Sequence, residues 1–178
     1  LGKKGDFLIT NSMTVGIPII LDIETCFHDG FLYLGFNDRE QCNYYNLYLF
    51  HFFTSYRQEL ISKSKDGIVK NLNTDIIKEV KIPIPRNFNK NYSSFTIQKV
   101  IVEFLEFWKI KYSDVFRNKI AHIQPIFHIM KKNLISSTFK KDKKIVESFN
   151  EFVKYKGINL KFEDVKSEKK SFGDISKF

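Results

Sequence analysis

The sequence predicts an α+β fold, in which a small mixed β-sheet domain with helices is followed by a long α-helix of the coiled-coil-forming kind. Short β-rich runs bounded by turn residues fill the first third of the chain. Two later segments place apolar residues at helical spacing without an internal Gly or Pro. With 178 residues, 43% of them hydrophobic, the chain has room for one main core.

The first third is expected to form a small antiparallel or mixed sheet. Residues 7–10 are a β-rich run after a Lys-Lys-Gly-Asp turn signal, and residues 11–14 read as a polar loop. A second strand is predicted over residues 15–21. Aromatic and aliphatic residues around Gly30 and Gly35 predict a third over residues 27–36.

A helix is predicted over residues 43–61, because apolar residues recur at helical spacing and neither Gly nor Pro interrupts them. Its aromatic stripe is interpreted as core that faces the sheet, in preference to a platform for stacking nucleic-acid bases. Residues 62–67 form a basic loop, and residues 68–73 a short strand or turn.

The middle of the chain carries clear local signals. Asn73 is placed to cap a short helix that ends near Lys78, because its side-chain oxygen can accept from an unpaired helical N–H. Residues 80–85 alternate and include Pro83 and Pro85, which suits an edge strand that does not need every N–H. Residues 86–95 read as a polar linker.

A long helix is predicted from Ile97 to at least His122, about 40 Å at 1.5 Å per residue. Pro125 then interrupts the pattern, and residues 126–139 resume it. The apolar stripe predicts a helix–helix interface with a second repeat or a second copy, although packing within its own domain remains an alternative. The stripe consists of Ile97, Ile101, Phe104, Trp108, Tyr112 and Val115.

The last part of the chain is basic, with a short helix expected over residues 145–155, a helix end at Gly157 and a mobile linker over residues 161–171. We therefore divide the chain into three regions. Residues 1–92 form the sheet domain, which we expect to be incomplete at its N-terminus, and residues 93–139 form the long helical region. Residues 140–178 form a basic helix and linker, which we expect to lead into a second domain.

The charge is unevenly distributed. The formal net charge is +9, yet residues 1–62 hold four bases and seven acids, and residues 63–178 hold 25 bases and 13 acids. This excess favours a polyanionic partner, with nucleic acid ahead of an anionic membrane surface. The alternative is codon bias on a solvated surface, since 25 of the 29 bases are Lys.

The sequence lacks the motifs that are typical of metal sites, cofactor sites and catalytic sites. Cys26 and Cys42 follow no secretory signal, which favours a reducing cytosol, and they show no zinc spacing with the four His residues. No phosphate-cradling Gly-rich loop and no Asn-Pro-Pro-aromatic box is present. Glu163 and Asp164 read as a solvated segment. We therefore expect no metal, no cofactor and no catalysis, and no apolar run is long enough to cross a membrane.

A set of motifs in a fixed order resembles the DNA specificity subunit of type I restriction-modification systems. They are Lys4-Gly5-Asp6-Phe7-Leu8-Ile9-Thr10, Val15-Gly16, Gly67-Ile-Val-Lys-Asn-Leu72, Ile82-Pro83-Ile84-Pro85, Gln98-Lys-Val-Ile101 and Lys131-Lys-Asn-Leu-Ile135 with Phe139. The resemblance covers residues 3–139. Phe172-Gly173-Asp174-Ile175 is similar to the opening of a further recognition domain. The chain departs from the family pattern in the twelve residues between Pro85 and Gln98.

The resemblance implies a cytoplasmic, non-catalytic subunit that binds duplex DNA and reads half of a split target. It would position the methyltransferase and restriction endonuclease subunits, and its long helix would set the half-site spacing. Two alternatives stay open: the recognition part of a fused type IIG restriction-methylation enzyme, and a helical scaffold protein without a nucleic-acid role.

Candidate DNA contacts follow from side-chain chemistry. Base edges can be read by amide and hydroxyl groups, which are expected at Asn11, Ser12, Thr14, Asn71 and Asn73. Phosphates would be contacted by Lys63, Lys65 and Lys70. Each amide has a structural rival role, such as turn formation at Asn11 and helix capping at Asn73.

Overall fold

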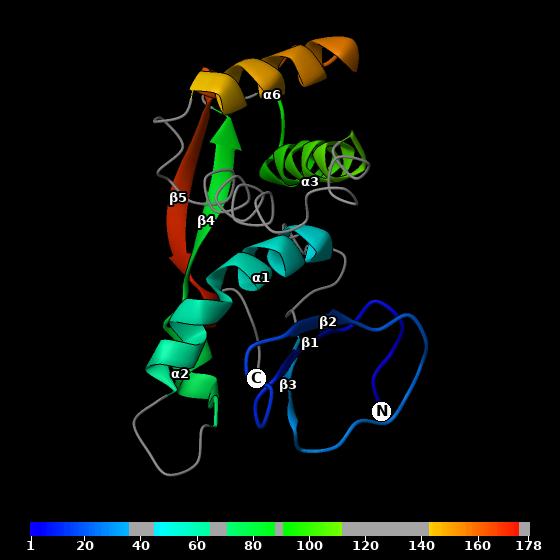
Figure 1. The fold of residues 1–178 in the computed structure, drawn as a ribbon, viewed down its shortest axis with the longest axis vertical. Helices are drawn as coiled ribbons and strands as arrows, with labels where there is room; N and C mark the ends of the chain where they lie inside the picture. Colours follow the sequence, from blue (N-terminus) through cyan, green and yellow to red (C-terminus); the bar gives the residue numbers. More distant parts are fainter. Residues whose placement is uncertain (36–44, 65–70, 88–90, 112–142, 175–178) are drawn as a thin grey trace, which may run out of the picture. The chain divides into compact units, whose positions relative to one another are not determined.

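The computed structural model describes residues 1–35, 45–64, 71–87, 91–111 and 143–174 (Figure 1). The chain divides into two compact units, Leu1–Ile82 together with Lys169–Phe178, and Pro83–Glu168. Helices and small sheets occur together, so the predicted α+β class is confirmed. None of the helices in the described ranges is long and apolar enough to cross a membrane.

The first unit contains a three-stranded antiparallel sheet. Its strands are β1 (Phe7–Thr10), β2 (Pro18–Ile20) and β3 (Phe31–Leu34), in the order β2-β1-β3. Leu8 is opposite Ile19 on one side and Tyr33 on the other. Because side chains alternate along a strand, Leu8 and its two partners share one face, and Phe7 and Ile9 share the other. The three predicted strands are present: β1 has the predicted bounds, and β2 and β3 are shorter than the sequence pattern indicated.

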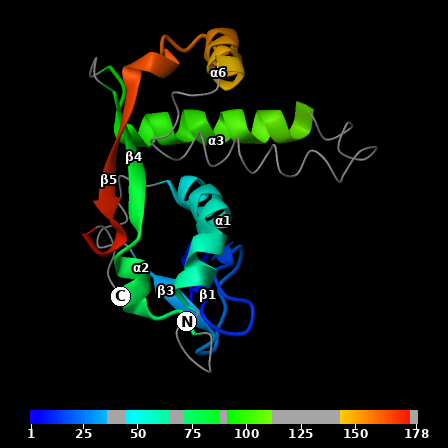
Figure 2. The same ribbon diagram turned by 60° about the vertical axis from the view of Figure 1, so that its left-hand side comes forward.

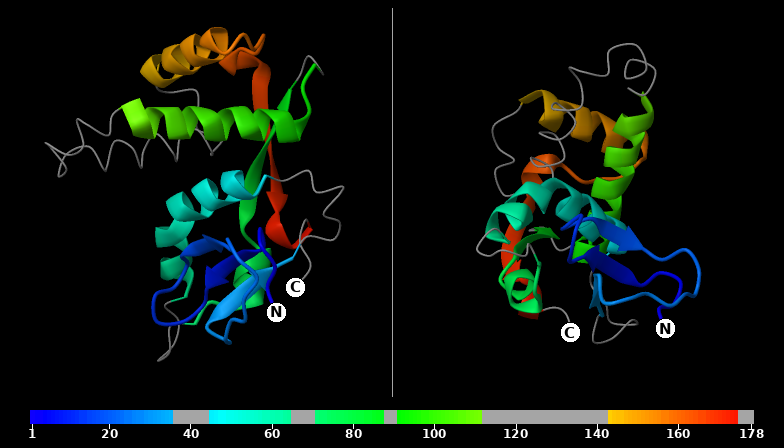
Figure 3. Two further views of the ribbon diagram at one scale, coloured as in Figure 1. Left: turned by 90° about the vertical axis from the view of Figure 1, so that its right-hand side faces the viewer. Right: turned by 60° about the horizontal axis from the view of Figure 1, so that its bottom comes forward.

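One face of this sheet is covered by α1 (Asn46–Lys63), as Figure 3 shows. The rings of Phe7 in β1 and Phe53 in α1 have centroids 5.9 Å apart, and Phe53 also meets Phe172 edge-on at 5.5 Å. Tyr48 is buried as well, and burial raises the pKa of its phenol. The interpretation of the aromatic stripe as core is therefore confirmed.

A short helix, α2 (Thr74–Lys78), completes the unit with help from residues near the end of the chain. Asn73 caps α2 as predicted, its side chain accepting a hydrogen bond from Ile76 N at 2.9 Å. The Ser171 hydroxyl donates to the Lys78 carbonyl at 2.7 Å, and Phe172 N donates to the Val80 carbonyl at 2.8 Å. Phe172 begins the 3₁₀ turn η3 (Phe172–Asp174).

The prediction of a mobile linker over residues 161–171 is wrong. The structure has a 3₁₀ turn, η2 (Phe162–Asp164), followed by strand β5 (Val165–Ser171). This strand pairs with β4 (Lys81–Asn87), the predicted proline-containing strand, in a two-stranded sheet whose arrows point in opposite directions (Figure 1). A strand in a two-stranded ribbon need not bury one face, so its sequence need not alternate between apolar and polar residues. The sequence of β5 is mostly charged and polar, and it therefore lacks the alternation that predicts a strand.

The second unit is built on α3 (Ser94–Lys111) and α6 (Lys143–Tyr155), which are neighbours in Figure 2. The Phe104 ring of α3 lies 5.3 Å from Phe149 and 5.5 Å from Phe152, both in α6. Ile97 and Ile101 are buried too. This part of the apolar stripe therefore packs within its own chain, the alternative that the sequence left open, and α6 is the partner of Phe104.

The ends of these helices agree only in part with the sequence. The α6 helix ends as predicted, with Gly157 at φ +67° in the left-handed region. The α3 helix is described to Lys111, and Trp108 lies within it, but its side chain is not described. Tyr112, Val115 and the predicted continuation to His122 lie outside the described residues.

Candidate DNA-recognition surface

Asn11 is the point at which three separate segments of the first unit meet. Its backbone N–H donates to the Gly30 carbonyl at 2.9 Å, and its Nδ2 donates to the Asp29 carbonyl at 2.8 Å. Its own carbonyl accepts from Leu72 N at 2.8 Å. One residue thus ties the loop after β1 to the turn before β3 and to the segment before α2.

The loop after β1 is closed by Thr10. Thr10 exchanges backbone hydrogen bonds with Ile17 and Gly16, and its hydroxyl accepts from Ile17 N at 2.9 Å while donating to the Thr14 carbonyl. Gly16, at φ +80°, supplies the left-handed turn that lets the chain return into β2. Residues 12–14 therefore project as a closed loop, and Met13 at φ +55° is fully exposed at its tip.

The turn before β3 is formed by residues 28–30. Gly30 N donates to Nδ1 of His28 at 2.8 Å, and the His28 ring packs on Phe31 with centroids 5.0 Å apart. A Cβ on Gly30 would lie 2.3 Å from the His28 ring and 3.4 Å from the Ser12 hydroxyl oxygen. A side chain at this position would therefore have to displace the His28 ring, and Ser12 of the neighbouring loop lies against this turn.

The segment before α2 is anchored by Leu72, whose side chain is 1% exposed. Asn71 and Asn73 flank it and are both exposed. Because Asn73 Oδ1 accepts from Ile76 N, its remaining amide N–H groups are the part that can meet a ligand. The buried leucine therefore holds two exposed amides beside Asn11.

Asn11 itself has a positioning role in the structure. Its Oδ1 is buried and accepts no hydrogen bond from the described part of the chain, while its Nδ2 donates a hydrogen bond to the Asp29 carbonyl. Pairing with both edge atoms of adenine uses the amide oxygen and nitrogen together, so Asn11 would have to turn its side chain to do so.

The structure brings together the segments that carry all five residues proposed to read bases. The three segments joined at Asn11 carry Asn11, Ser12, Thr14, Asn71 and Asn73. Lys63 is exposed as the last residue of α1. Lys65 and Lys70 lie outside the described residues. We call the surface formed by residues 11–14, 28–30 and 71–73 the recognition surface.

Sequence reasoning missed two residues of this surface, His28 and Asp29. The His28 side chain is 75% exposed, and that of Asp29 is fully exposed. The Asp29-Gly30 dipeptide is a turn signal that could have marked a loop here. No local pattern could reveal that this turn lies against residues 11–14, because that contact depends on the pairing of β1 with β3.

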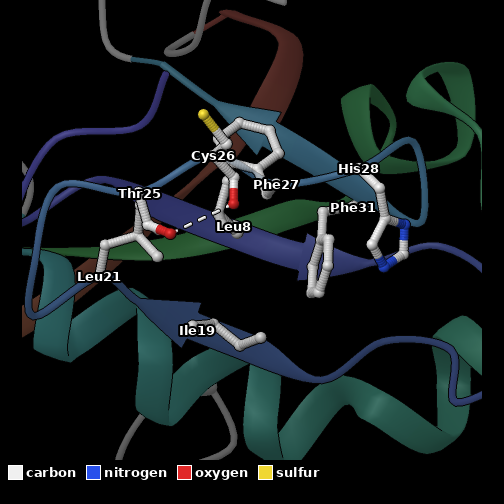
Figure 4. Close-up of a pocket in the computed structure, with 8 residues that line it drawn as sticks. All are labelled: Leu8, Ile19, Leu21, Thr25, Cys26, Phe27, His28 and Phe31. Atoms are coloured by element: carbon white, nitrogen blue, oxygen red, sulfur yellow. Dashed lines mark hydrogen bonds between the residues drawn. The ribbon is translucent and has the colours of Figure 1, made fainter.

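A hollow of about 640 Å³ adjoins the turn on the sheet face that α1 leaves uncovered (Figure 4). Most of its lining is apolar, and His28 belongs to both the hollow and the recognition surface. The lining consists of Leu8, Ile19, Leu21, Thr25, Cys26, Phe27, His28 and Phe31. No group of His, Cys, Asp or Glu able to hold a metal ion occurs among the described residues.

Comparison with known proteins gives one result that bears on this surface. Residues 1–123 match the family model of the type I restriction modification DNA specificity domain, and that range contains every residue of the recognition surface. No curated protein and no solved structure matches the chain significantly. Since the match spans 123 of 178 residues, the chain belongs to the family of type I restriction modification DNA specificity domains.

Proposed function

We propose that the chain is a sequence-specific, non-catalytic recognition subunit that reads half of a split duplex target in a type I restriction-modification complex. The backbone hydrogen bond from Leu72 to Asn11 carries this proposal, because it joins the two polar segments assigned to base reading into one surface. Methyl transfer and cleavage would belong to the methyltransferase and restriction endonuclease subunits that this chain positions, in the cytoplasm.

Base reading is assigned to the exposed polar groups of residues 11–14 and 71–73. Hydroxyl and amide groups form hydrogen bonds with base edges, and a closed loop holds them in place at little cost in conformational entropy. Thr10 closes residues 11–16, and buried Leu72 fixes residues 71–73, so both segments present polar groups from a constrained backbone. Such constraint supports discrimination between bases.

Affinity is assigned to phosphate contacts from Lys63, Lys65 and Lys70. Residues 1–62 are net acidic, so the sheet by itself offers little general attraction to DNA. Lysines in the stretch from the end of α1 to Asn71 would supply that attraction next to the base-reading segments. Binding should therefore weaken steeply as salt rises.

The apolar stripe of α3 is assigned a second role beyond residues 97–104. Those residues are buried within the chain, with Phe104 against α6, so pairing with a second repeat or a second copy would use the later part of the stripe, at Trp108, Tyr112 and Val115. Such a pair of helices would fix the distance between two half-sites.

The test is a gel-shift titration of the full chain with duplexes selected from a library with a randomised core. We expect one motif to be enriched, and affinity to fall about a thousandfold or more between ~50 and ~200 mM salt if six or more phosphates are contacted. The double variant Ser12→Ala/Asn71→Ala should lose affinity for the enriched duplex, whereas Ser167→Ala on β5 should not. Methyl transfer or cleavage by the chain alone, or no motif, contradicts the proposal.

A further inference from the structure

We infer that Asp29 is a specificity-determining residue, whose carboxylate accepts a hydrogen bond from the amino group that cytosine or adenine presents in the major groove. The inference rests on the proposed function, because it takes the recognition surface as the surface that meets DNA. It assigns a base-reading role to the turn before β3.

The backbone at Asp29 is held in place while its side chain is exposed. Its carbonyl accepts from Asn11 Nδ2 at 2.8 Å, and the next carbonyl, of Gly30, accepts from Asn11 N at 2.9 Å. The carboxylate is fully exposed, and the next residue, Gly30, lies close to the Ser12 hydroxyl. A charged group on a fixed backbone beside other base-reading groups has the geometry that discrimination requires.

His28 adds a hydrogen-bond donor to the same turn. Its Nδ1 accepts from Gly30 N at 2.8 Å, so the proton of the neutral ring is on Nε2. Nδ1 lies 3.6 Å from Asp29 Oδ1, and two acceptors do not bond to each other, so the carboxylate keeps its capacity for a ligand. The hydrogen bond from Gly30 N and the contact with the Phe31 ring orient the imidazole.

An acceptor beside a donor complements specific base edges. Adenine presents an amino donor next to the N7 acceptor, and a C·G pair presents the cytosine amino donor beside the O6 acceptor of guanine. Guanine and thymine themselves present acceptors where a carboxylate would need a donor. Asp29 therefore discriminates by attraction to an amino group and by repulsion from a carbonyl.

Charge supports the same assignment over a phosphate-contact role. A carboxylate is repelled by phosphates, so Asp29 lowers general affinity for duplex DNA. Replacement by the nearly isosteric asparagine removes that repulsion and supplies an amide that can face either donors or acceptors. Discrimination should fall while affinity for unrelated duplex rises or stays the same.

The experiment is selection from a randomised duplex library by the wild type, by Asp29→Asn and by Asp22→Asn. Asp22 is an exposed carboxylate of the same unit, outside the recognition surface, so its replacement makes the same change in net charge. We expect Asp29→Asn to reduce the preference for the selected base pair at one position of the motif about tenfold. Asp22→Asn should select the wild-type motif.

The outcomes separate this inference from the proposed function. If the wild type selects a motif and Asp29→Asn selects it with equal stringency, the role of Asp29 is overturned while the proposed function stands. Loss of stringency spread over the whole motif, with no single base pair relaxed, overturns the assignment of Asp29 to one amino group. If the wild type selects no motif, both fail. Unchanged thermal unfolding of each variant confirms that the fold is intact.

Discussion

The backbone N–H of Leu72 donates a 2.8 Å hydrogen bond to the carbonyl of Asn11, which lies just after the first strand of the sheet. The Leu72 side chain is almost completely buried. A backbone bond and an apolar anchor at one residue therefore attach the segment before α2 to the loop after β1. This attachment is what makes a single recognition surface out of two distant segments.

Leu72→Ala should destabilise the chain and weaken DNA binding together. Removing a buried leucine side chain costs about 2–5 kcal/mol, because transfer energy is lost and a cavity is left. Denaturant unfolding followed by circular dichroism measures the loss. Leu47→Ala, at a leucine of α1 that is 39% exposed, is the matched control and should cost much less. Equal losses for the two variants would contradict the anchoring role of Leu72.

Replacements of Asn73 separate its capping role from its proposed role in base reading. Asn73→Ala should cost about 1 kcal/mol of stability, whereas Asn73→Ser keeps a side-chain oxygen for Ile76 N and should cost little. Both variants lose the amide N–H groups. If those groups contact a base, both variants should bind the selected duplex more weakly in a gel shift. Binding by Asn73→Ser at the wild-type affinity would show that Asn73 only caps the helix and does not contact a base.

Lys63→Gln should reduce the salt dependence of DNA binding. Each phosphate contact contributes about 0.9 to the slope of log affinity against log salt, so loss of one contact should lower the slope by about that amount. Fluorescence anisotropy over a salt series gives the slope. Lys154→Gln, at an exposed lysine of α6, makes the same charge change outside the proposed contacts and should leave the slope unchanged.

Phe104→Ala should destabilise the second unit independently of protein concentration. Phe104 is fully buried against Phe149 and Phe152 of the same chain, so its truncation should cost about 3–5 kcal/mol. Phe107→Ala, on the same helix and 39% exposed, should cost less. A melting temperature that rises with protein concentration in the wild type and not in Phe104→Ala would instead place Phe104 at an interface between chains.

Local signals in the sequence predicted most of the elements. The β-rich run of residues 7–10, the aromatic stripe now in α1, the Asn73 cap, the proline-containing β4 and the Gly157 helix end all appear in the structure. Each depends on neighbours within a few residues of the chain, so periodicity and capping chemistry suffice to find it. The ordered motifs likewise indicated the family that the comparison then established.

The sequence by itself determined the α+β class, the main strands and helices, and the polar character of the two loops proposed to read DNA. Tertiary structure alone decided that β5 is a strand, that α6 covers the buried part of the α3 stripe, and that His28 and Asp29 lie beside Asn11. These features depend on hydrogen bonds and packing between residues far apart in the chain. Local sequence patterns do not specify which distant segments come into contact.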